Sequence, residues 1–274
     1  MPDEGPNSQP QESFPVIERP EHLTEAGARF FDAHEKVATF LLFVANLVVR
    51  ADEVRKIAAE ALLKGDPEPE KREELERKLE EGDVVSDTLR KEYRQLLFET
   101  TLARAVDNFL TYVAELMSVV FKTRPETLRS GAKVEIAYIL SHDSMDDLIE
   151  NLAERRVEQL AYAGLRELQE NLETTLGFQL FTSEEELEQA VMLVEGRNIV
   201  VHNRGVVNKT YLSRVPGSDR KLGERLQFNV DPFFDDLAFL AKAGVDIDAR
   251  AAAKWDIRRS ASRDSGGNGV ICSL

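Results

Sequence analysis

The strongest constraint on the fold is a long apolar stripe at helical spacing in the middle of the chain. Between residues 86 and 122, large apolar side chains recur every three or four positions, which predicts one helix with a single buried face. Arg124-Pro125 ends this pattern, because a residue before proline disfavours helical backbone. Such a face requires other elements to cover it. The stripe consists of Leu102, Val106, Phe109, Leu110, Val113, Leu116, Met117 and Val120.

The rest of the chain predicts further helices, with no alternation of strands and helices. A first long helix is expected from Thr24 to Leu63, where Gly65-Asp66-Pro67 stops it. We therefore predict an all-α fold: a helical bundle with an added long N-terminal helix and disordered termini. Shorter helices are expected over residues 144–163, 165–176, 183–204 and 235–243, and short extended segments over 206–207, 211–212 and 227–230.

Composition divides the chain into four expected regions. Residues 1–21 hold five prolines among polar residues, which predicts a disordered N-terminal segment. Residues 22–83 form the N-terminal helix and a charged linker, and residues 84–245 form the main helical domain. The segment 246–274 is expected to be a largely disordered C-terminal tail, since it ends in a glycine-rich stretch.

Charge and cysteine usage limit where the protein works. A single cysteine, Cys272, excludes an internal disulfide framework and favours a reducing cytoplasm. The first twenty residues are acidic and proline-rich, unlike a signal peptide. The apolar run Val37–Val49 is too short to span a bilayer, so we expect a buried helix segment and no membrane association. The net charge of −15 argues against broad, charge-driven binding of nucleic acid.

One segment, Arg197 to Gly205, concentrates groups that can do chemistry. Asn198 and His202 are four positions apart and share a helix face, whereas Arg197 and His202 are five apart, about 140° round the helix. A site that uses both therefore requires a deformed helix end or a second copy of the helix. Gly196 either lets that second helix approach closely or is merely tolerated at a cost of about 1 kcal/mol.

Arg197, Asn198 and His202, at the close of a predicted helix that Gly205 stops, resemble the signature of the HEPN superfamily. Residues 98–128 also resemble that family's first core helix, so the resemblance covers about residues 84–215. It implies an HEPN-like bundle and a metal-independent endoribonuclease whose site forms between two copies in a homodimer. It further implies RNA as substrate, a role in stress or phage defence, no cofactor, and room for a neutralising protein partner.

The expected chemistry is attack of the ribose 2′-hydroxyl on the adjacent phosphorus. His202 suits general acid or charge-stabilising work, because an imidazole titrates near neutrality. Arg197 can hold two phosphate oxygens with its planar fork, and Asn198 can orient either group. These three are the predicted catalytic residues. In one branch of the superfamily a modified tyrosine lies two positions after the histidine; here Arg204 stands there, so that control is not expected.

Basic residues after the motif predict a polyanion site in an acidic chain. From 197 to 225 there are seven basic residues against two acidic ones, a local excess of five, although a solvated basic loop would look the same. The predicted substrate-binding residues are Asn203, Arg204, Lys209 and Arg214.

Three alternatives remain open from the sequence. In the first, the chain is expected to be a catalytically silent HEPN module that dimerises or binds a partner. In the second, it is expected to be a helical scaffold in which His202 only stabilises a helix end. A metal site at His142-Asp143, with Asp146 and Asp147, competes with a plainer interpretation as the N-cap of a helix. We predict no metal site.

Overall fold

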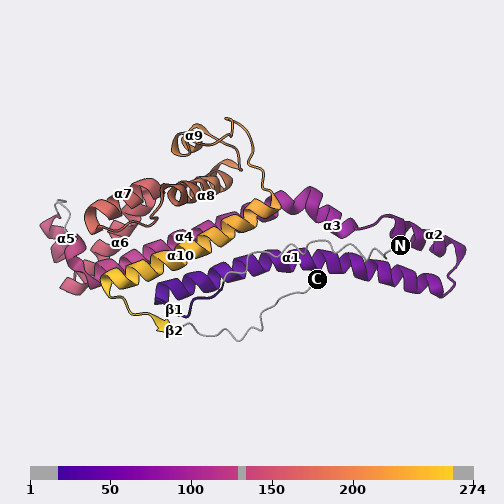
Figure 1. Ribbon diagram of the computed structural model, residues 1–274, viewed down its shortest axis with the longest axis horizontal. Helices are drawn as coiled ribbons and strands as arrows, with labels where there is room; N and C mark the ends of the chain where they lie inside the picture. The colour runs from indigo at the N-terminus through magenta and orange to yellow at the C-terminus, as the bar shows by residue number, and fades with distance from the viewer. Residues whose placement is uncertain (1–17, 129–133, 262–274) are drawn as a thin grey trace, which may run out of the picture.

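The computed structural model describes residues 18–128 and 134–261, with the backbone alone for 156–163. Within these residues it is an all-α bundle with one two-stranded pairing, as the sequence predicts (Figure 1). The elements are β1 (His22–Leu23), α1 (Glu25–Lys64), α2 (Pro69–Glu80), α3 (Val84–Thr88), a π-helical turn (Leu89–Tyr93), α4 (Arg94–Thr123), a 3₁₀ turn (Pro125–Leu128), α5 (Ile136–Leu140), α6 (Met145–Ala163), α7 (Leu165–Leu176), α8 (Glu184–Asn203), α9 (Lys209–Arg214), α10 (Val230–Trp255) and β2 (Ser260–Ala261).

Three long helices form the body of the molecule. α1, α4 and α10 lie side by side, α6 and α8 cover α4 on the side away from α1, and α7 packs against α6 and α8 (Figure 1). The stripe on α4 supplies the centre of the core, where Val106, Phe109 and Leu116 have no exposed surface. Phe30 of α1 and Leu240 of α10 belong to the same core, so α1 packs directly on the helical domain.

A buried polar contact joins the start of α1 to the second half of α10. Thr24 caps α1, accepting a hydrogen bond from the Gly27 N–H at 3.0 Å. The carboxylate of Asp248, which is fully buried, accepts from the Thr24 N–H at 2.9 Å and from its hydroxyl at 2.5 Å. The antiparallel pairing of β1 with β2 lies beside this contact and brings residues 22–23 against 260–261.

Several expected boundaries are confirmed and others need correction. α1, α6, α7 and α8 begin and end within about one residue of the prediction. The expected extended segment at 211–212 lies instead in helix α9. α10 runs from Val230 to Trp255, far beyond 235–243, so a tail beginning at residue 246 is wrong. Ile247, Ala251 and Trp255 are buried at helical spacing and continue the packed face of the helix.

The predicted termini correspond only partly to described residues. Arg19, expected in the disordered segment, forms an ion pair with Asp32 at 2.5 Å. The disorder predicted for residues 1–17 and 262–274 concerns residues outside the described part of the chain. No helix in the described ranges is long and apolar enough to cross a membrane.

The apolar run Val37–Val49 is only half buried, contrary to expectation. Leu41 is buried, but Phe40, Phe43 and Leu47 are each more than half exposed. Beyond this run, α1 is accompanied by α2 and α3, and its buried side chains there are Asp52 and Ala59. The Asp52 carboxylate accepts from the backbone N–H groups of Val85 and Ser86, which fixes the start of α3.

Candidate functional site

The end of α8 carries the candidate catalytic motif. Ser183 caps the start of the helix by accepting from the Glu186 N–H at 3.1 Å. At the other end, Arg204 is the first left-handed residue, with φ 56°, and Gly205 follows with φ 74°. The N–H groups of both donate to the Ile199 carbonyl. The chain therefore turns sharply two residues after His202.

Arg197 points its guanidinium into its own chain. Its Nη2 pairs with the Asp107 carboxylate of α4 at 2.6 Å, and its Nη1 donates to the Asn198 side-chain oxygen at 3.1 Å. The side chain is 21% exposed, and its Nε is buried with no hydrogen-bond partner among the described residues. One N–H of the guanidinium is therefore without an acceptor in the described part of the single chain. A buried donor in this situation is uncommon and costs about 1–3 kcal/mol.

A buried glutamate organises the rest of the network. Glu195 is 4% exposed, and its carboxylate accepts from Arg214 of α9 at 2.9 Å and from the Asn198 side-chain amide at 3.3 Å. Arg197, Asn198, Glu195 and Arg214 are therefore linked through α8 and α9, while Asp107 ties them to α4. These contacts hold the motif's first half in one arrangement, because a buried carboxylate is stable only when paired.

His202 stands apart from this network. It is exposed, and in the described part of the chain it has no hydrogen bond or ion pair. Arg204 and Lys209 are also exposed and, within the same residues, unpaired. Asn203 donates to the Val206 carbonyl at 2.6 Å and so belongs to the helix stop. One copy of the chain therefore connects Arg197 with Asn198 but links neither of them to His202.

The basic segment is largely neutralised by carboxylates, which the composition did not indicate. Four of its seven cations pair: Arg197 with Asp107, Arg214 with Glu195, Arg220 with Glu224, and Arg225 with Glu99. Three of these carboxylates come from α4 and α8, outside the loop. The remaining positive side chains are Arg204, Lys209 and Lys221, which in the described residues have no acidic partner.

Gly196 faces the interior of its own chain. A Cβ built on it would lie 3.8 Å from Leu102 of α4 and 3.8 Å from Leu226, which is ordinary contact distance. Because this face of α8 is already covered by α4, Gly196 is not where a second helix approaches. The structure thus favours the plainer of the two interpretations, in which the glycine is tolerated.

Sequence reasoning missed two residues that decide how Arg197 is held, Asp107 and Glu195. Each signal was weak but present: Glu195 interrupts the apolar stretch before the motif, and Asp107 follows the buried Val106 directly. A carboxylate at the edge of a buried helical face needs a cation, and the structure pairs these two with Arg197 and Arg214, both of which were predicted to contact the substrate.

The acidic segment before α6 behaves as a helix start. Ser144 accepts from the Asp147 N–H at 3.1 Å, and His142 Nδ1 lies 2.7 Å from the Tyr138 carbonyl oxygen. Across the described ranges, no three His, Cys, Asp or Glu side chains are grouped closely enough to hold a metal ion.

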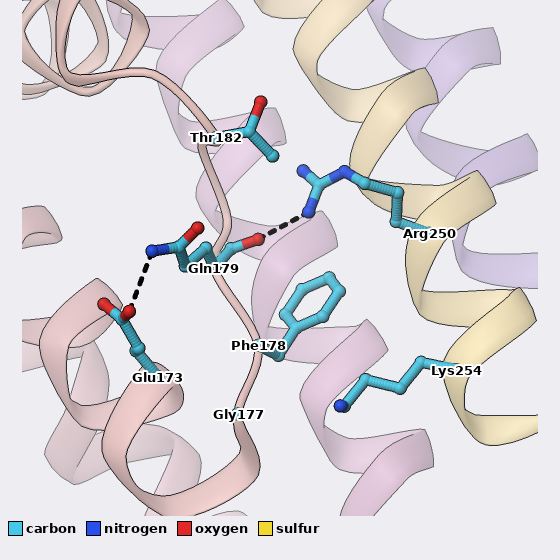
Figure 2. A pocket seen from close by; sticks show the side chains of 7 residues that line it. All are labelled: Glu173, Gly177, Phe178, Gln179, Thr182, Arg250 and Lys254. Carbon is cyan, nitrogen blue, oxygen red and sulfur yellow. Dashed lines mark hydrogen bonds between the residues drawn. The ribbon is translucent and has the colours of Figure 1, made fainter.

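A separate surface pocket of about 460 Å³ lies between α10 and the segment joining α7 to α8 (Figure 2). Arg250 of α10 donates to the Gln179 carbonyl at 2.6 Å and to the Leu180 carbonyl at 2.5 Å. Glu173 accepts from the Gln179 side-chain amide at 2.8 Å. These contacts engage Glu173, Gln179 and Arg250 in holding the segment that joins α7 to α8, so we assign the pocket a structural role.

Outside comparison adds no constraint on these residues. The chain matches no protein-family model, no curated protein and no solved structure.

Proposed function

We propose that the protein is a metal-independent endoribonuclease of HEPN type that acts at the end of α8. The observation that carries the proposal is the exposure of His202 without a partner in the described chain, one turn beyond the anchored Arg197. Arg204 and Lys209 follow it in the sequence, are exposed and have no acidic partner among the described residues, so they can hold RNA phosphates. An exposed imidazole near such cations in the sequence is suited to proton transfer beside a phosphate.

The proposed reaction involves two proton transfers, one from the ribose 2′-hydroxyl and one to the leaving 5′-oxygen. A base removes the proton of the ribose 2′-hydroxyl, the oxygen attacks phosphorus, and the bond to the 5′-oxygen breaks as that oxygen is protonated. The products are a 2′,3′-cyclic phosphate and a 5′-hydroxyl. His202 serves as the acid, and Arg197 stabilises the charge on the phosphoryl oxygens through its fork. Asn198, hydrogen-bonded to Arg197, keeps the fork oriented.

A second copy completes this site in the proposal. Arg197 and His202 lie about 140° apart on α8, and Arg197 is turned toward Asp107. Two α8 ends facing each other across a two-fold axis would let His202 of one copy reach the phosphate near Arg197 of the other. The Nε–H of Arg197 has no acceptor among the described residues, but it is buried, so it could bind a phosphate only once the guanidinium moves away from Asp107.

One observation favours the alternative of a catalytically silent module. The pairs Arg197–Asp107 and Arg214–Glu195 neutralise two cations that phosphate binding would need. An enzyme must exchange Asp107 for substrate at Arg197, whereas a silent module keeps that pair as a structural fastener.

Cleavage of RNA by the purified chain in the presence of chelator separates the two. We expect cyclic phosphate ends, and a loss of about 100-fold or more for His202→Ala, the size typical of losing a positioned acid. His22→Ala removes another exposed histidine, from β1, and is the matched control that keeps full activity. Arg197→Lys keeps the charge but not the fork, and should also lose cleavage.

Two results would contradict the proposal. Equal cleavage by wild type and His202→Ala places the activity elsewhere or in a contaminant. No cleavage by wild type, with no growth arrest on expression, favours the silent module. Urea unfolding of each variant provides the check on folding, and His202→Ala should change stability by no more than about 0.5–1 kcal/mol, because the side chain is exposed at a helix end.

A further inference from the structure

The outer face of α1 is apolar and uncovered by the described chain. Five large apolar side chains there are between 53 and 65% exposed. The opposite face of the same stretch carries the buried residues Leu41 and Ala59. A helix that is apolar on both faces is expected to be covered on both. The exposed residues are Phe40, Phe43, Leu47, Val54 and Ile57, called the α1 seam below.

The spacing of the α1 seam is that of paired helices. Its members follow one another by three, four, seven and three positions, and Arg50 takes the place that would divide the interval of seven. This is the three-four alternation of a helix that packs along its length on another helix. The seam is also widened by α4: Phe40 and Thr100 line a common groove of about 530 Å³, and Leu96, one turn before Thr100, is 59% exposed.

The two ends of the seam carry side chains of opposite charge that have no ion-pair partner among the described residues. Lys36 lies one turn before Phe40 and Glu60 lies one turn after Ile57; both are exposed, and neither has a side-chain partner among the described residues. The midpoint of Lys36 and Glu60 is residue 48, and the midpoint of Phe40 and Ile57 falls between 48 and 49. One antiparallel register therefore satisfies the apolar and the charged residues together.

We propose that the α1 seam is an interface with a second copy of this chain, in which two α1 helices pair antiparallel about a two-fold axis near residues 48 and 49. Phe40 then faces Ile57 of the partner subunit, and Phe43 faces Val54 of the partner subunit. Lys36 forms an ion pair with Glu60 of the partner subunit at each end of the seam. Such an interface is self-complementary, as a two-fold axis requires.

The expected size of the interface sets its strength. The seam spans 18 residues, about 27 Å of helix, and with α4 it is about two helix diameters, or roughly 20 Å, wide. This gives about 500 Å² on each copy and about 1,000 Å² in total, the lower limit for a specific interface. The dimer should therefore be weak, with a dissociation constant on the order of micromolar.

This interface is independent of the proposed catalytic site. α8 lies across the α4–α10 layer from α1 (Figure 1). Pairing through α1 keeps the two α8 ends apart and so cannot join Arg197 to His202. A chain that pairs through both faces would form a tetramer only if the two axes cross at right angles, and would otherwise form larger assemblies. In every case loss of the α1 seam would reduce the mass to that of a monomer or of an α8-linked dimer.

Sedimentation equilibrium of the full chain between about 1 and 200 µM tests the proposal. In this register Leu47 faces Arg50 of the partner subunit. Leu47→Lys should therefore raise the dissociation constant by about 100-fold or more, because a lysine would face an arginine twice in the middle of the seam. Val49→Lys is the matched control: it is about 200° round the helix from Leu47, is 41% exposed, and should leave the assembly unchanged.

A charge exchange tests the register and the identity of the partner. Lys36→Glu alone and Glu60→Lys alone should each raise the dissociation constant by roughly 10-fold, because like charges then face each other twice. The double variant should return to within about 3-fold of wild type, which only a second copy in this register can produce. A monomer at every concentration overturns the proposal and assigns the face to a different partner. An assembly that Leu47→Lys leaves intact overturns it as well.

Discussion

Two glycines inside helices give a direct test of the packing. Gly244 of α10 lies against the ring of Phe30: a Cβ built there would come within 2.2 Å of Cε1 and 2.8 Å of both Cδ1 and Cζ. Gly196 of α8 is equally buried, yet its nearest neighbours would lie 3.8 Å away. The same substitution to alanine should therefore have opposite effects on stability at the two positions.

The magnitudes follow from two opposing contributions. Alanine is favoured over glycine inside a helix by about 1 kcal/mol, and at Gly196 nothing opposes this gain. At Gly244 the Phe30 ring would have to move, but it is 2% exposed, with its centroid 5.0 Å from Tyr112 and 5.5 Å from His34. Overpacking of a full core costs about 1–3 kcal/mol or more. We expect Gly196→Ala to stabilise by about 0.5–1 kcal/mol and Gly244→Ala to destabilise by up to about 2 kcal/mol.

Urea unfolding followed by far-ultraviolet circular dichroism measures both changes, and an unchanged m-value would show that the unfolded state is unaffected. Destabilisation by both variants would refute the reasoning. It would mean that α8 needs, at position 196, either the backbone flexibility of glycine or the close helix approach that glycine allows. Loss of assembly in Gly196→Ala, with the fold intact, would restore the idea that a second helix approaches there.

Two further predictions concern buried polar groups. Burial lowers the pKa of His34, whose Nε2 lies 2.8 Å from the Leu237 carbonyl oxygen. The free energy of unfolding should therefore be highest above about pH 6.5 and fall as the pH drops from there toward the lowered pKa. The reason is that in this range only the unfolded chain takes up the proton. Measured unfolding free energies between pH 5 and 8 should lose this slope in His34→Gln and keep it in His22→Gln. Asp248→Ala leaves two donors of Thr24 unpaired and should cost about 2 kcal/mol or more in thermal unfolding, while Asp246→Ala, at an exposed ion pair, should cost less than about 1 kcal/mol. Equal shifts for Asp248→Ala and Asp246→Ala would contradict the role given to the Thr24 contact.

Helix positions were predictable where local signals act. Thr24, Ser144 and Ser183 cap helices, as their side chains can satisfy free N–H groups without any distant partner. The length of α10 was underestimated, although alanine favours helix and Ile247, Ala251 and Trp255 recur at helical spacing. Only Gly244 is a poor helix former there, and its role depends on Phe30, more than two hundred positions earlier in the sequence.

The candidate site was predictable in its residues but not in its connections. The end of α8 at Arg204 and Gly205 follows from local backbone preference. The pairing of Arg197 with Asp107 depends on how α8 lies on α4, which helical periodicity does not specify. For the same reason the positive charge of the loop, counted along the sequence, gave no sign that carboxylates from other helices would offset most of it.

The contact of α1 with α10 also sets the order in which a growing chain can finish folding. Thr24 and Phe30 leave the ribosome early, while their partners Asp248 and Gly244 are made more than two hundred residues later. At typical synthesis rates of about 5–20 residues per second, that interval lasts roughly 10–45 s. During it, α1 lacks α10 on its inner side and, before a second copy arrives, also has its seam in water. The first helix to be synthesised is thus the last to have its apolar surface fully buried. It is therefore the segment that remains accessible to a chaperone for the longest time.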